Sequence, residues 1–159
     1  MQNAALEILD LLIAIEKEMS RLYFDFAMEY NSNPEQHSFW QNIAMEEVEH
    51  ASFLESESQI ISSISELKFV QFVNKQKTEE TLAEIKRCRA ELAQSPYSHE
   101  QAIQVALKME LGYNEHLLRH SLKTEFPELR RMIETLGGMN EKHIQLLSKY
   151  TAELKEKND

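Results

Sequence analysis

Residues that interrupt helices are scarce in this sequence, and the few that occur divide it into long segments. The chain of 159 residues contains only three Pro and three Gly. Asn33 has the character of a helix N-cap, and Pro34 after it suits the first position of a helix. Pro96 marks a second break, and Pro127 begins another helix. These breaks favour an all-α fold made of long helices.

Apolar residues recur with helical spacing between these breaks. The predicted helices span residues 3–30, 34–61, 99–123 and 127–155. We expect the first two to form a hairpin over 3–61 and the last two a hairpin over 98–155, joined by a connection of residues 62–97. The connection is long enough to cross the length of a bundle and to contain one or two helices. The sequence therefore predicts an antiparallel four-helix bundle that forms a single domain over 1–159.

Each predicted hairpin has acidic and histidine side chains on helical stripes that are otherwise apolar. Glu47 and His50 are three residues apart, so they share one face of their helix. Glu16 is the one charged residue in the apolar stripe of the first helix, as Glu110 is in that of the third. His143 lies on the apolar stripe of the fourth helix. Burial of such groups is costly unless each one binds a partner.

Two such hairpins, packed about a pseudo-twofold axis, would bring these side chains together at the centre of the bundle. Four-helix bundles build dinuclear iron or manganese centres from a Glu on each of two helices and a Glu-x-x-His on each of the others. Carboxylate oxygens and imidazole nitrogens suit Fe(II) and Mn(II). The predicted metal ligands are Glu16, Glu47, His50, Glu110 and His143.

Three segments resemble a known family. AIEKEMSRLYFDFA, IAMEEVEHA and ALKMELGYNEHLL together resemble the rubrerythrin-type branch of the ferritin-like superfamily, and the resemblance extends over most of the chain. It implies a ferritin-like bundle with a long connection after the second helix and a di-iron carboxylate site. It also implies that Glu16 and His50 are terminal ligands of one metal and that Glu47 is a bridge. Glu110 and His143 would bind the second metal.

The chain departs from this family at two positions. Asn140 occupies the position of the second bridging Glu, and Glu141 lies about 100° further around the helix. Leu117 stands where family members often have a Tyr. Because Asn140 brings no charge, we expect weaker binding of the metal at Glu110 and His143. An active centre would make the chain a non-haem iron oxidoreductase of rubrerythrin type, with one or two ions of Fe2+/Fe3+ or, alternatively, manganese.

Charge and composition narrow the expected partners and location. A formal net charge of -10 argues against nucleic acid and anionic membranes. The single cysteine, Cys88, excludes an internal disulfide and suits a cytoplasmic protein. The N-terminus has no basic start, and no apolar run approaches the length of a membrane span. Since the chain lacks a Cys-rich rubredoxin-like module, we expect metal ions and a redox partner protein as its partners.

Two alternatives stay open. The chain could be a non-catalytic helical interaction protein that has kept the fold but lost the full metal site, with Asn140 completing a buried Glu–His hydrogen-bonded network. The apolar residues of 67–73 are interpreted as part of the structural connection, with a homodimer contact as the alternative. The remaining histidines are expected in solvent or at the rim of the bundle: His37, His99, His116 and His120.

Overall fold

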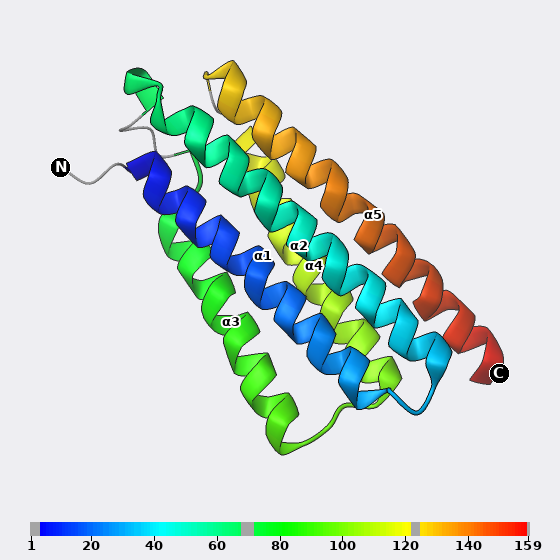
Figure 1. The fold of residues 1–159 in the computed structure, drawn as a ribbon. Helices are drawn as coiled ribbons and strands as arrows, with labels where there is room; N and C mark the ends of the chain where they lie inside the picture. The colour runs from blue at the N-terminus through cyan, green and yellow to red at the C-terminus, as the bar shows by residue number, and fades with distance from the viewer. Residues whose placement is uncertain (1–3, 68–71, 122–124, 159) are drawn as a thin grey trace.

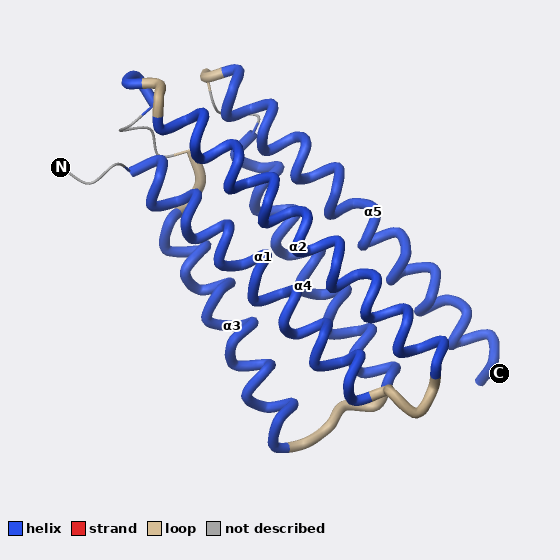
Figure 2. Tube along the Cα trace, in the orientation of Figure 1, coloured by secondary structure: helices blue, strands red, loops and turns tan. Residues whose placement is uncertain are grey.

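The computed structural model describes residues 4–67, 72–121 and 125–158, and these residues form helices and loops without any strand. The helices are α1 (Ala4–Glu29), α2 (Pro34–Ser62), the 3-10 helix η1 (Ser65–Leu67), α3 (Lys75–Gln94), α4 (His99–Ser121) and α5 (Pro127–Asn158). The five α-helices lie side by side as an elongated bundle (Figure 1). The described loops lie at the two ends of this bundle (Figure 2). The all-α prediction is therefore confirmed for the described residues.

Two helix starts are capped by side chains, and the first of these caps is the one that the sequence predicts. The side chain of Asn33 accepts hydrogen bonds from the backbone N–H groups of Glu35 and Gln36, at 3.1 and 3.2 Å. At the start of α4, the N–H of Gln101 donates to Ser98 Oγ, and the N–H of Ser98 donates to the Gln101 side chain. A cap of this kind stabilises a helix by about 1 kcal/mol, so both breaks are fixed locally.

The predicted connection contains η1 and a long helix, α3, which packs on the outside of α1. Ile85 and Leu92 on its apolar side are buried. α3 returns along the bundle, so that α4 runs in the same direction as α2 (Figure 1). Phe72 and Val73, just before α3, are also buried, which favours their structural interpretation, whereas residues 68–71 lie outside the described part.

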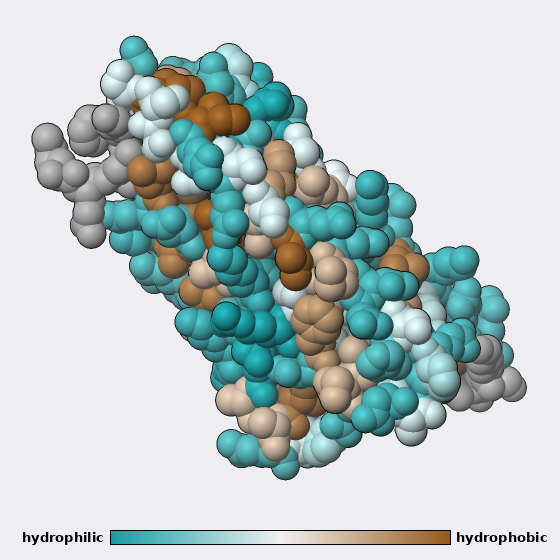
Figure 3. Space-filling view, in the orientation of Figure 1, coloured by the Kyte–Doolittle hydropathy of each residue, from teal (hydrophilic) through white to brown (hydrophobic). Residues whose placement is uncertain are grey.

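The core lies between two helical hairpins, α1 with α2 and α4 with α5. Leu12, Leu54 and Leu136 are among its fully buried residues. A partly buried ion pair joins the hairpins, because the exposed Arg131 of α5 donates to the nearly buried Glu57 of α2 at 3.0 Å. Most of the face seen in Figure 3 is hydrophilic, with apolar residues in seams between the polar ones. None of the described helices is both long enough and apolar enough to cross a membrane.

One arginine of α3 binds two acidic residues of α1. Arg89 donates to Asp25 at 2.7 Å and to Glu18 at 2.9 Å, and Glu18 is largely buried. We expect Arg89→Gln to lower the free energy of unfolding by about 1–2 kcal/mol, because it removes charge-assisted bonds to a partly buried carboxylate. Urea unfolding followed by circular dichroism measures this change.

Arg87→Gln is the matched control for this measurement. Arg87 is exposed, and among the described residues it forms ion pairs only with Glu84 and Glu91 of its own helix. Its replacement should change the free energy of unfolding by less than about 0.5 kcal/mol. Equal effects of the two substitutions would show that Arg89 does not hold α3 on α1.

Candidate metal centre

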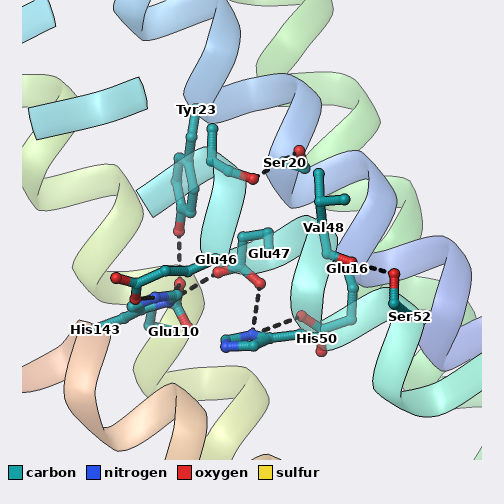
Figure 4. Close-up of polar contacts among 11 residues, drawn as sticks. Glu16, Ser20, Tyr23, Glu46, Glu47, Val48, His50, Ser52, Glu110 and His143 are labelled. Atoms are coloured by element: carbon teal, nitrogen blue, oxygen red, sulfur yellow. Dashed lines mark hydrogen bonds and ion pairs between the residues drawn. The ribbon is translucent and has the colours of Figure 1, made fainter. Parts of the chain in front are cut away.

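Glu47 lies at the middle of the buried polar cluster and faces a histidine with each of its carboxylate oxygens (Figure 4). His50 Nδ1 lies 2.9 Å from Glu47 Oε2, and His143 Nδ1 lies 2.9 Å from Glu47 Oε1. Glu47 and His50 share a face of α2 because they are three residues apart, and α5 brings His143 alongside. The imidazole rings are nearly parallel, with centroids 5.0 Å apart. Glu47 therefore bridges the two histidines.

A second carboxylate faces each of these histidines, and each comes from the first helix of the same hairpin. His50 Nδ1 lies 3.4 Å from Glu16 Oε2 of α1, and His143 Nδ1 lies 3.4 Å from Glu110 Oε1 of α4. All five side chains are buried, with at most 5% of their surface exposed. The structure thus brings together every residue that the sequence predicted as a ligand, from four helices and in two similar halves.

The donor atoms of this cluster fit a metal ion. One ligand atom each of Glu47, His50 and His143 lies within 4.8 Å of the other two. Glu16 Oε1 is buried and makes no hydrogen bond to any described residue. Such an atom costs about 1–3 kcal/mol, and a cation beside it would remove that cost. Oxygen and imidazole donors are those that Fe(II) and Mn(II) prefer.

Asn140 lies in α5 one turn before His143, and only 1% of its surface is exposed. Neither its amide oxygen nor its amide nitrogen makes a hydrogen bond to any described residue. The expectation that Asn140 completes a buried hydrogen-bonded network is therefore wrong for this part of the chain. Its uncharged oxygen is instead one more donor at the position of the absent carboxylate.

Glu46 is a member of the centre that the sequence analysis missed. Its carboxylate accepts a hydrogen bond from His143 Nε2 at 2.7 Å, although the Glu46 side chain is 52% exposed. With a proton held on Nε2 by this contact, His143 directs its Nδ1 atom towards Glu47 and Glu110. Glu46 lies outside the apolar stripe of α2, so no periodicity indicated it.

Two tyrosines support the carboxylates of α1 and α4. The hydroxyl of Tyr23, on α1, donates to Glu110 Oε1 at 2.8 Å (Figure 4). Tyr113, on α4, lies close to Glu16: burial and the charge of Glu16 raise its pKa well above the usual value. Leu117, where the resembled family often has Tyr, is buried and apolar. Tyr113, one turn before Leu117 in α4, is thus the tyrosine that lies beside Glu16.

The pKa values of the cluster reflect burial and close packing of the acids. Burial, followed by the charge of Glu47, raises the pKa of Glu16 to about 8. Burial lowers the pKa of His50, but hydrogen bonds with Glu16 and Glu47 outweigh it and raise the pKa to about 10. Burial likewise lowers the pKa of His143, whereas hydrogen bonds with Glu110 and Glu47 raise it to about 11. Without metal, both imidazoles are therefore protonated on both nitrogens and positively charged at neutral pH.

Two of the other histidines are less exposed than the sequence analysis expected. His99 is half-buried among the rings of Tyr30, Phe39, Trp40 and Tyr150, because α4 starts against this aromatic group, and burial lowers its pKa. His116 is buried, with Nε2 at 3.3 Å from Thr78 Oγ1 of α3, because the predicted connection covers this side of α4. The predictions of a solvated position for His99 and of a surface or rim position for His116 are therefore wrong. Of the other two histidines, His37 is partly exposed, and the side chain of His120 lies outside the described residues.

Comparisons of this chain with models of known families, with curated proteins and with solved structures find no match. The rubrerythrin-type resemblance therefore stays a prediction from the sequence segments. The interpretation of the centre depends on the geometry of its side chains.

Metal binding should compete with protons at this centre. A metal at Nδ1 must displace the proton that His50, with a pKa of about 10, holds at neutral pH. We expect protons to be released on addition of Mn(II), and the affinity to rise about tenfold per pH unit for each proton displaced. The affinity rises with pH, and does not fall, because fewer protons remain bound to His50 as the pH approaches its pKa of about 10.

Calorimetric titration at pH 6, 7 and 8, in buffers of different ionisation enthalpy, counts the protons released. An affinity that does not change over this range would show that the metal binds without displacing a proton from either imidazole.

Proposed function

We propose that this protein is a ferritin-like metal-binding protein that holds iron, or alternatively manganese, between its two helical hairpins. The observation that carries the proposal is the position of Glu47, which faces His50 with one oxygen and His143 with the other. Glu16 and Glu110 complete the two halves. Two hairpins joined by a connection that returns along the bundle are the arrangement expected of a ferritin-like fold.

The residues of the centre would form two metal-binding halves. Glu16 and His50 would hold one ion, Glu110 and His143 the other, and Glu47 would bridge them. Glu46 fixes the orientation of His143, and burial of all the ligands excludes bulk water. A bound iron pair would supply electron-transfer chemistry towards dioxygen or peroxide, as in a non-haem oxidoreductase. A chain with one cysteine cannot form a Cys-rich rubredoxin-like module, so electrons would come from a separate redox partner protein.

One observation favours a second function. Asn140 leaves the cluster one carboxylate short of the four that balance two divalent ions, as expected for an interaction protein that has lost a complete site. The exposed Glu46 restores part of this charge, because it lies within hydrogen-bond distance of His143. We therefore place the metal-binding function first.

His50→Ala tests the proposal. We expect untagged wild-type protein, loaded with Fe(II) without oxygen and desalted, to retain about one to two equivalents of iron. His50→Ala should retain at least tenfold less, because it removes an imidazole ligand that lies beside both Glu16 and Glu47. Elemental analysis measures the retained iron, and circular dichroism verifies that the helices remain.

His37→Ala is the control, because His37 contacts the backbone oxygen of Ala27 and takes no part in the cluster. Its iron content should equal that of the wild type. If the wild-type protein itself retained no iron or manganese, the interaction-protein function would replace the proposed one.

Asn140→Glu tests the role of the missing carboxylate. We expect the wild type to fill its two halves unequally, because an uncompensated charge in the interior is costly. Asn140→Glu should raise the stoichiometry towards two ions and increase any turnover of oxygen or peroxide, whereas Asn140→Gln, which stays neutral, should not. Anaerobic titration with Fe(II) gives both stoichiometries. Two equivalents bound with similar affinity by the wild type would show that another group, such as Glu46, replaces the carboxylate.

A further inference from the structure

A cavity of about 190 Å³ lies between α1, α3 and α4, outside the proposed metal centre. Its inner walls are apolar and consist of Ile15 and Met19 of α1, Ile85 of α3 and Met109 of α4. These four side chains are buried in the protein. Lys77, on α3, and Lys108, on α4, lie at its exposed rim. The cavity therefore combines an apolar interior with a polar entrance.

The size of the cavity limits what it can hold. An apolar protein cavity of about 150 Å³ accommodates benzene, so this one has room for an apolar group of about six to eight carbons. The interior offers few polar groups, and the hydroxyl of Tyr113 on its wall is buried. A ligand with one polar end would therefore place its apolar part inside and its polar end at the rim.

The charges at the rim favour an anionic polar end. Lys108 contacts Glu84 at 3.4 Å, and this pair is weak because the lysine is 80% exposed. Lys77 makes no ion pair with any described residue. Glu84 is also close to Arg87, at 3.8 Å, and Glu115, the other acidic residue at the cavity, is engaged with a neighbour. Glu84 thus has two cationic neighbours, Lys108 and Arg87, whereas Lys77 has no ion pair with a described residue and can approach an anionic group.

We propose that this cavity binds a medium-chain amphiphile with an anionic head, such as a saturated carboxylate of about eight carbons. The chain would lie among Met19, Ile85 and Met109, and the carboxylate would lie between Lys77 and Lys108. This binding goes beyond the proposed metal function and does not require the metal. The ligand would, however, lie next to the centre, because Tyr113 lines the cavity and is also close to Glu16.

Gly112 provides a direct way to fill the cavity. It lines the cavity from α4, and a Cβ atom added there would meet no atom within 4 Å. A glycine inside a helix costs about 1 kcal/mol relative to Ala, so a larger residue here should not harm folding. Gly138, in α5, also has nothing within 4 Å of an added Cβ, and it does not line the cavity. Gly112→Leu and Gly138→Leu are therefore a matched pair.

The experiment is a titration of metal-free protein with octanoate, followed by NMR of methionine methyl groups labelled with carbon-13. Met19 and Met109 line the cavity, whereas Met28 and Met45 are exposed elsewhere. We expect saturable shifts of the Met19 and Met109 signals and none of the other two. Gly112→Leu should weaken binding at least tenfold, and Gly138→Leu should bind as the wild type does.

The charge of the head group is tested with octanol and octylamine. Replacement of both lysines, as Lys77→Gln with Lys108→Gln, should weaken octanoate binding at least fivefold and leave octanol binding unchanged. Three results would overturn the proposal: unmoved Met19 and Met109 signals, equal binding by Gly112→Leu, or octylamine binding as tight as that of octanoate. Because no metal is present, failure here is distinct from failure of the proposed metal function.

Discussion

The fold depends on the mutual neutralisation of acids and imidazoles that are buried in one layer of an apolar core. Glu16, Glu47 and Glu110 could not stay buried alone, since the desolvation of a carboxylate costs several kcal/mol. His50 and His143 each lie within 3.4 Å of two of these acids, so the four helices that supply them must meet at one level. The polar layer therefore fixes the register of the two hairpins, whereas the apolar layers around it supply most of the stability.

The helices and the convergent ligands could be predicted because both follow from helical periodicity. Glu16 and Glu110 were identifiable as single acids on apolar stripes, and the structure places them beside His50 and His143. Glu46 was not identifiable, because its contact with His143 depends on how closely α5 approaches α2 rather than on the pattern within α2. The packing of α3 on α1 could not be predicted for the same reason, because it depends on contacts between side chains that are distant in the sequence.

The two departures from the resembled family have counterparts in the structure. Asn140 lacks a charge, and Glu46 contacts His143, one turn further along α5, from the solvent side. Leu117 lacks a hydroxyl, and Tyr113 of the preceding turn lies beside Glu16. A carboxylate and a hydroxyl therefore lie at the cluster in positions that the resemblance did not indicate.

The aromatic group next to the centre gives the protein an internal optical reporter. Trp40 is the only tryptophan in the sequence and is fully buried, so its emission arises from one position. Its ring lies 5.6 Å from the ring of Tyr23, whose hydroxyl donates to Glu110. Any change of charge at Glu110 alters the electric field at an indole two side chains away. We therefore expect the tryptophan fluorescence of the unlabelled protein to change when the charge of Glu110 changes.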